Sequence, residues 1–277
     1  VYDGTALTNG TVTVGGADGF ADGEGATYDV TGSQTVVGES DNTFTYTLNK
    51  GTKADNYTIE KTEGKLKVTA VTDEVVVTIK ENAGTATYDG GDHIVSGYAS
   101  MTADNELYDV DASVQETPTA AWAAKGTNVG EYPVGIVAGD FKNTNANFSN
   151  VEFVVVDGKL EITPVTDEVV VTITENSGTV KYDGTEKTVT GYTVTNISNK
   201  LYAEKDFTFN GKAEVKGTDA GTYDMALKAS DFTNRNANFS KVTFVIEDGQ
   251  LVIEKRKVTL TSGSGEKVYD GTALTNG

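Results

Sequence analysis

The chain begins and ends on the same ten residues. VYDGTALTNG stands at 1–10 and again at 268–277, an offset of 267 residues. Self-similarity at a fixed offset is the signature of an array in which similar units follow one another. We therefore expect one super-repeat followed by the start of a further copy, in a parent protein that carries several copies.

Shorter repeats divide the super-repeat. VTDEVVVTI occurs at 71–79 and again at 165–173. The triplet Tyr-Asp-Gly (YDG) begins at Tyr2, Tyr88, Tyr182 and Tyr269. Each spacing is long enough for a unit with its own core. We predict modules at 1–70, 71–164 and 165–254, with 255–277 forming the leading strand of a next copy.

The first module lacks one segment that the other two have. The apolar strand before YDG has its counterpart only at 257–267, at the far end of the chain. A missing strand leaves an unpaired edge and a gap in a core. We expect the 1–70 module either to be incomplete or to be completed by residues 257–267 of a neighbouring molecule, through head-to-tail β-strand addition.

The residue types favour strands throughout. Thr and Val are β-branched and suit a pleated surface, whereas Gly, Asn and Asp supply turns. Two segments of the third module, Asn210-Gly211 and Glu247–Gln250, are typical of hairpin turns. Short strands separated by turns at this spacing predict a β-sandwich. In the third module we expect strands over 168–174, 179–182, 187–197, 207–215, 222–227, 242–246 and 251–253.

A second motif sharpens the sandwich prediction. The third module has Asp219, Gly221 and Tyr223 in the order D-x-G-x-Y, and the second has Gly130 and Tyr132. The order resembles the tyrosine corner of immunoglobulin-like domains, in which the Tyr hydroxyl bonds to upstream backbone. The Asp is expected to cap the turn and the Gly to allow a positive φ. In the first module we assign the corner to Tyr57.

These patterns together predict the fold. We expect an all-β chain of three tandem immunoglobulin-like β-sandwich modules, with β-grasp-like modules as the alternative. The junctions near Ala70, Pro164 and Lys257 contain no Gly/Ser-rich linker, so the modules should form an extended rod. A strand of about ten residues rises roughly 33 Å, which gives a rod of about 100 Å.

The ordered motifs resemble a known family. They are the YDG opening at 267–272, the Gly-Thr-x-x-Gly-x-Tyr run at 217–223, and Gly-x-Leu-x-Ile at 158–162 and 249–253. This set resembles the YDG and MBG repeats of large bacterial surface proteins. The resemblance implies an extracellular module on the bacterial cell surface, attached through regions outside this chain. It implies a stalk or adhesive role and carries over no catalytic residue.

Composition excludes several partners. The chain has 41 acidic and 22 basic residues, a formal net charge of −19. Such a surface repels the phosphates of nucleic acids and anionic membranes, which require clustered Lys and Arg. No apolar run is long enough to span a bilayer. We therefore expect no nucleic-acid partner and no membrane insertion. With no Cys, disulfides and thiolate metal sites are excluded.

Catalytic and metal chemistry have little support. The one His, His93, follows the second YDG triplet and is expected in an exposed loop. No carboxylate pair stands out as acid and base. We therefore predict no enzyme, no cofactor and no metal site. Weak calcium binding is the minority hypothesis for two oxygen-rich loops, and Asx turns are the alternative. These loops contain Asp140, Asn143 and Asn145, and Asp231, Asn234 and Asn236.

Two functions remain in competition. The first is a non-catalytic stalk of a surface adhesin that projects a binding region from the cell wall. The alternative is that the modules themselves bind a host glycan, a matrix protein or another copy of the chain. Tyr favours interfaces, so Tyr98, Tyr192 and Tyr202 are the candidates for such contacts.

Overall fold

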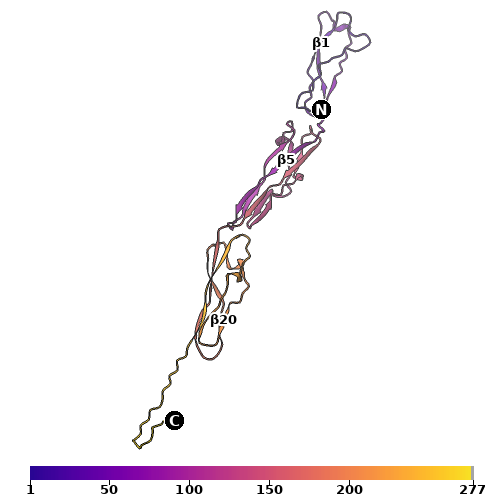
Figure 1. The fold of residues 1–277 in the computed structure, drawn as a ribbon. Helices are drawn as coiled ribbons and strands as arrows, with labels where there is room; N and C mark the ends of the chain where they lie inside the picture. The colour runs from indigo at the N-terminus through magenta and orange to yellow at the C-terminus, as the bar shows by residue number, and fades with distance from the viewer. Residues whose placement is uncertain (276–277) are drawn as a thin grey trace. The chain divides into compact units, whose positions relative to one another are not determined.

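The computed structural model describes residues 1–275 and is nearly all β (Figure 1). Those residues contain 24 strands and one α-helix, α1 (Val110–Ser113), of four residues. None of their helices is long and apolar enough to cross a membrane. Two compact units are present. Unit 1 comprises residues 1–86 and 92–162, and unit 2 comprises residues 87–91 and 163–277. The division into three modules stays a prediction.

The third repeat, residues 165–254, lies in unit 2. Its central sheet has the order β18-β15-β23, and a second sheet has the order β16-β24-β21. Two strand pairs, β17–β20 and β19–β22, complete the repeat. The bounds are β15 (Val169–Glu175), β16 (Gly178–Lys181), β17 (Lys187–Thr190), β18 (Tyr192–Ile197), β19 (Phe207–Phe209), β20 (Glu214–Gly217), β21 (Gly221–Asp224), β22 (Phe232–Asn234), β23 (Val242–Glu247) and β24 (Gln250–Glu254).

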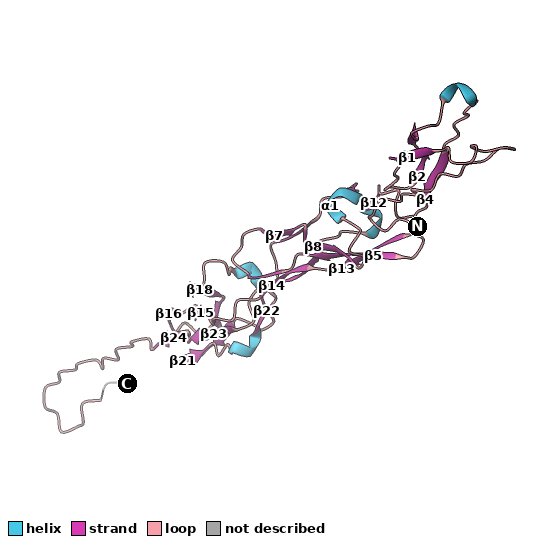
Figure 2. Ribbon diagram, turned by 90° about the horizontal axis from the view of Figure 1, so that it is seen from above, coloured by secondary structure: helices cyan, strands magenta, loops and turns pink. Residues whose placement is uncertain are grey.

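The second repeat, in unit 1, has the same plan. Figure 2 labels several of its strands, among them β5, β8 and β13. Its sheets are β13-β5-β8 and β11-β14-β6, with the pairs β10–β7 and β12–β9. The bounds are β5 (Val75–Glu81), β6 (Gly84–Thr87), β7 (His93–Ser96), β8 (Tyr98–Ala103), β9 (Val114–Glu116), β10 (Ala123–Gly126), β11 (Gly130–Pro133), β12 (Phe141–Asn143), β13 (Val151–Val156) and β14 (Lys159–Thr163).

The leading strand lies in the middle of each of these repeats. Alternate side chains of a strand point to one face, so Val169, Val171 and Ile173 of β15 all point inward, and each is 0% exposed. Leu251 and Ile253 of β24 join them from the other sheet in one hydrophobic cluster. Burying large apolar side chains between two sheets is the main stabilising term of such a sandwich.

The all-β prediction is confirmed, with a difference in strand direction. β15 runs antiparallel to β18 but parallel to β23, and β16 runs parallel to β24. A β-grasp module would need a helix across its sheet, and the part of the chain that the structure describes has only the four-residue α1 and 3-10 helices of three residues each. The sandwich prediction, rather than the β-grasp alternative, therefore agrees with the structure.

Two predicted hairpins are wrong. The strands on either side of Asn210-Gly211 do not pair with each other, because β19 pairs with β22 and β20 with β17. Likewise, β23 and β24 flank Glu247–Gln250 but pair with β15 and β16. In both cases the chain passes from one sheet to another at the turn. Turn residues alone do not specify which strand becomes the partner.

The first repeat, residues 1–70, has fewer strands. Its bounds are β1 (Ala26–Val30), β2 (Gly38–Asn42), β3 (Phe44–Leu48) and β4 (Gly64–Val68). They form two antiparallel pairs, β1–β3 and β2–β4. Leu66 and Val68 of β4 are its buried apolar side chains. No strand of the described residues occupies the place that β5 and β15 hold in the other repeats.

Candidate functional site

A contact between consecutive repeats recurs. In unit 1 the ring of Tyr2, from the first YDG triplet, packs edge-on against Phe148 of the second repeat, with ring centroids 5.7 Å apart. The backbone N–H of Val37 donates to Asn147 Oδ1 at 2.8 Å. A third ring, Tyr108, packs against Phe148 from the second repeat itself. Residues from two repeats therefore share one aromatic cluster.

The same arrangement recurs in unit 2. Tyr88, in the YDG segment 87–91, packs edge-on against Phe239 with centroids 5.6 Å apart. Tyr202 packs against Phe239 in the way that Tyr108 packs against Phe148. The N–H of Tyr88 donates to Thr163 O, as that of Tyr2 donates to Thr69 O. We call this the YDG joint: a YDG tyrosine on the Phe of the next Asn-Ala-Asn-Phe-Ser loop.

The Asn side chains of these loops hold the loop in shape. Asn143 Oδ1 accepts from Tyr108 and from Asn145 N, both at 2.9 Å, and Asn143 Nδ2 donates to Phe148 O at 2.8 Å. Asn145 Oδ1 accepts from Asn147 N. Asn234 and Asn236 make the equivalent bonds in the third repeat. These oxygens order the loop as Asx turns do.

The two carboxylates of the predicted calcium loops are also engaged. Asp140 is 1% exposed and accepts from Thr119, Trp122 Nε1 and Val137 N. Burial acts to raise the pKa of Asp140, but these hydrogen bonds outweigh burial and hold the pKa below its ordinary value. Asp231 accepts from Lys228 N at 2.9 Å. Within residues 1–275 no cluster of three or more acidic or His side chains could hold a metal ion.

The corner tyrosines make the bond that the motif predicts. Tyr132 Oη donates to Asn128 O at 2.8 Å and Tyr223 Oη to Asp219 O at 3.0 Å, each four residues upstream. Asp219 thus contributes its backbone carbonyl. Gly130 has the expected positive φ, of 156°, whereas Gly221 has none.

A different glycine makes room for the ring. A Cβ on Gly126 would lie 2.3 Å from the Tyr132 ring, and one on Gly217 would lie 2.4 Å from the Tyr223 ring. The first Gly of the Gly-Thr-x-x-Gly-x-Tyr run is therefore the one that the corner requires.

The assignment of Tyr57 to the corner needs correction. Tyr57 Oη accepts from Ala21 N and donates to Glu24, and its ring packs on Phe20. Strand register shows the reason. Tyr132 pairs with Leu160 in the second repeat, and Ser40 pairs with the matching Leu66 in the first. Ser40 therefore stands at the corner position. Tyr57 follows Asn56 as Phe148 follows Asn147, so in sequence Tyr57 matches Phe148.

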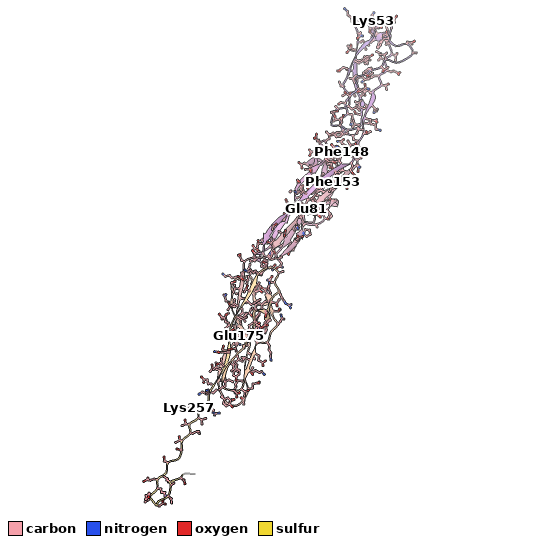
Figure 3. All side chains as sticks on the ribbon, in the orientation of Figure 1. Lys53, Glu81, Phe148, Phe153, Glu175 and Lys257 are labelled. Carbon is pink, nitrogen blue, oxygen red and sulfur yellow. The ribbon has the colours of Figure 1, made fainter. Side chains whose placement is uncertain are left out.

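Two buried glutamates, Glu81 and Glu175, were not predicted from the sequence. Glu81, at the end of β5, is 4% exposed and accepts from Ile136 N at 2.6 Å and from Gly158 N at 2.7 Å. Glu175 accepts from Leu227 N and Gly249 N in the same way. Figure 3 labels both glutamates, one in each repeat. Each carboxylate ties the leading strand to two loops. The signal was available, because Glu81 continues the inward alternation of Val75, Val77 and Ile79.

His93 and the candidate binding tyrosines lie in structured positions. His93 begins β7 and is half-buried, not in an exposed loop. Tyr202 is 3% exposed. Tyr98 packs on Trp122 and Phe141, and Tyr192 packs on aromatic rings of the third repeat. Tyr98 and Tyr192 are half-buried and Tyr202 is fully buried, so all three rings contribute to packing within their repeats.

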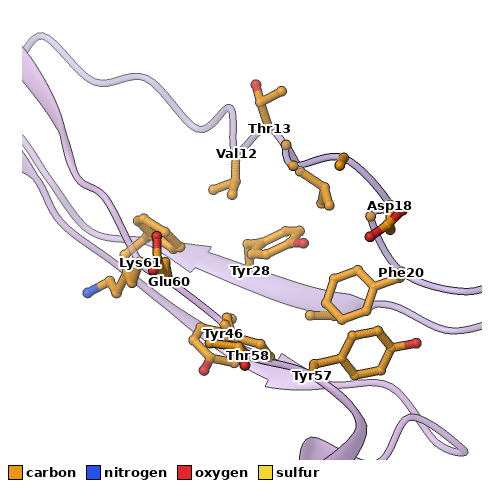
Figure 4. A pocket seen from close by; sticks show the side chains of 18 of the residues that line it. Val12, Thr13, Asp18, Phe20, Tyr28, Tyr46, Tyr57, Thr58, Glu60 and Lys61 are labelled. Carbon is orange, nitrogen blue, oxygen red and sulfur yellow. The ribbon is translucent and has the colours of Figure 1, made fainter.

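The first repeat contains an open groove of about 470 Å³ (Figure 4). One wall is the segment 12–20 and the other is 56–61. Tyr28 and Tyr46, from β1 and β3, lie between them, and Phe20 and Tyr57 are at one end. Polar side chains such as Asp18, Asn56 and Lys61 line the groove beside these aromatic rings.

Comparison with known proteins identifies the third repeat. The family model of the MBG domain matches residues 169–255. The resemblance to an MBG/YDG-type module is thus confirmed for this part of the chain, and it points to a repeat module of surface proteins. Comparisons with curated proteins and with solved structures gave no match.

Proposed function

We propose that the chain is a non-catalytic spacer in a bacterial surface adhesin, in which consecutive repeats are coupled through YDG joints. The observation that carries this proposal is the recurrence of the joint. Tyr2 and Tyr88 pack on Phe148 and Phe239 at nearly the same centroid distance and with the same edge-on geometry. A spacer that projects a binding region needs junctions that resist bending, and aromatic contacts reinforced by backbone hydrogen bonds supply such resistance.

The MBG match and the acidic surface support an extracellular location. A strongly negative chain stays soluble and resists non-specific association at a crowded surface. The location and the adhesin are parts of the proposal.

Small-angle X-ray scattering at low concentration tests the proposal. We expect a rod near 100 Å, with Tyr88→Ala giving a broader distribution of lengths than the parent chain. Tyr46→Ala, which removes a ring outside the joints, is the control and should leave the distribution unchanged. A compact particle, or a Tyr88→Ala profile identical to that of the parent, would count against a coupled spacer.

A further inference from the structure

The first and last segments of the third repeat lie side by side and point the same way. The first segment is β15 and β16, and the last segment is β23 and β24. β15 runs parallel to β23, and β16 runs parallel to β24. In both ladders each residue faces the one that lies 73 positions further along the chain, and between the ladders Gln250 N donates to Ser177 Oγ at 3.1 Å. The two segments therefore change sheets together and keep one register.

The direction of these segments decides how tension would load the repeat. A pull along the chain enters at the start of β15 and leaves at the end of β24, because the other strands of the repeat lie between them in sequence. Two parallel strands that are pulled at opposite ends slide lengthwise against each other. Because the hydrogen bonds of a parallel pair are evenly spaced along the strands, all of them then resist the pull together. A pair that is pulled apart at one end opens one bond at a time.

A buried glutamate lies at the point where both segments change sheets. Glu175, at the end of β15, is 3% exposed, and its carboxylate accepts from Gly249 N of the last segment at 2.7 Å. A Cβ on Gly249 would lie 2.5 Å from Glu175 O. Lengthwise sliding would remove the donor from the carboxylate and bring a residue with a side chain to the place of Gly249. The glutamate and the glycine thus fix the register of the two segments.

The second repeat has the same arrangement. β5 runs parallel to β13, and β6 pairs with β14 in the other sheet. Glu81 accepts from Gly158 N at 2.7 Å, and a Cβ on Gly158 would lie 2.1 Å from Asn82 O. In both repeats the inward apolar side chains of the leading strand are fully buried, so sliding would also drag them past their neighbours in the core.

We propose that the second and third repeats bear tension: a pull along the chain loads the first and last segments of each repeat in shear, and the glutamate–glycine pair holds their register. Resistance to a pull depends on the barrier to unfolding, which governs forced unfolding. Charge-assisted hydrogen bonds and backbone bonds that must break together raise that barrier. The inference goes beyond the spacer proposal, because it concerns tension within one repeat and not the coupling between repeats.

Single-molecule force spectroscopy on the full chain tests the inference through the direction of the pull. The chain has no Cys, so two introduced cysteines, reduced and then coupled to handles, define where force is applied. Thr166→Cys/Glu254→Cys loads the third repeat in shear. Lys181→Cys/Glu254→Cys, at facing residues of β16 and β24, peels the same strands apart from one end. At the same constant force we expect unfolding to be at least about a hundredfold slower in shear, because several hydrogen bonds must break at once.

Glu175→Gln tests the role of the carboxylate. The variant keeps the shape of the side chain but removes the charge that two backbone N–H groups share, so unfolding in shear should become about tenfold to a hundredfold faster. Glu186→Gln, the same change at an exposed carboxylate of this repeat, is the matched control and should leave the rate nearly unchanged.

Two results would overturn the inference. The first is the same unfolding rate in shear and in peeling, and this comparison needs no change in the core, so it decides even where Glu175→Gln does not fold. The second is an effect of Glu175→Gln that is absent, or equal in the two directions, because the carboxylate would then have no special role under shear. Both handles lie in the third repeat, so either result is independent of the scattering test of the joints.

Discussion

The third and first repeats share their motifs but not their degree of closure. In the third, β15 pairs with a strand on each side and buries Val169, Val171 and Ile173 completely. In the first, the corresponding position is a groove, and burial of apolar side chains is concentrated at Leu66 and Val68. The difference teaches that the sandwich is closed by its leading strand, which joins the central sheet and places three apolar side chains in the core.

The buried glutamate marks the same difference. Glu175 fixes the end of β15 by accepting two backbone N–H groups from loops of the same repeat. Seven residues before Tyr269, where Glu175 precedes Tyr182, the chain has Ser262. The segment 256–262 therefore lacks the carboxylate that fixes the ends of β5 and β15.

The largest effect is expected at Glu81, the counterpart of Glu175 in the second repeat. Glu81→Ala leaves the N–H groups of Ile136 and Gly158 buried without an acceptor, so the free energy of unfolding should fall by roughly 2–5 kcal/mol. Trp122, the only tryptophan, lies in this repeat and reports its unfolding in urea by fluorescence. Glu131→Ala, which removes an exposed partner of Lys159, should change it by less than about 1 kcal/mol. Equal effects of the two variants would show that the carboxylate has no special structural role.

A smaller effect is expected at the corner of the closed repeats. Gly126→Ala places a methyl group against the Tyr132 ring and should cost about 1–3 kcal/mol of unfolding free energy. Gly139→Ala, in the same repeat but with open space around its Cβ, is the control and should lie within about 0.5 kcal/mol of the parent. Trp122 fluorescence again serves as the measurement. A Gly126→Ala variant as stable as the control would mean that the corner ring can move aside at little cost.

Acid should destabilise the second repeat through Asp140. Its pKa in the fold is below the ordinary value of 3.8, so the ionised form stabilises the fold. That stability is present above about pH 3.8 and is lost as pH falls through the lower, folded pKa. Because Trp122 Nε1 donates to Asp140, its fluorescence should change over the same range. Asp140→Asn should flatten this dependence, and an unchanged acid slope in that variant would assign the effect to other carboxylates.

The smallest change in stability is expected at alkaline pH, where the buried tyrosines ionise. Burial, together with the negative charge of Asp206, raises the pKa of Tyr202 to about 12. The hydrogen bond to Glu116, together with burial, raises that of Tyr98 to about 12. Because the fold raises these pKa values, the contribution of each neutral phenol to the stability of the fold is fully present below about pH 10. That contribution is lost as the pH rises toward 12. Absorbance at 295 nm should show late ionisation that decreases in Tyr98→Phe and Tyr202→Phe. Ionisation of all tyrosines together near pH 10 would contradict these environments.

Much of the second and third repeats could be predicted from local pattern. The alternation of Val and Thr predicted the bounds of β15 to within one residue at each end, because alternation shows directly which face of a strand is buried. The hydroxyl bonds of Tyr132 and Tyr223 are also local, since each reaches a carbonyl four residues upstream. Glu81 could have been found as a charged residue in the inward phase of its strand.

What the sequence determined by itself is the β class and the repeat period, because strand alternation, turn residues and self-similarity are properties of neighbouring residues. Only the tertiary structure decided which strands pair across the layers, that Ser40 rather than Tyr57 holds the corner position, and that Glu81 and Glu175 accept from loops more than fifty residues away. The physical reason is that these features depend on backbone hydrogen bonds between distant segments, and such bonds leave almost no trace in the side-chain pattern of either segment alone.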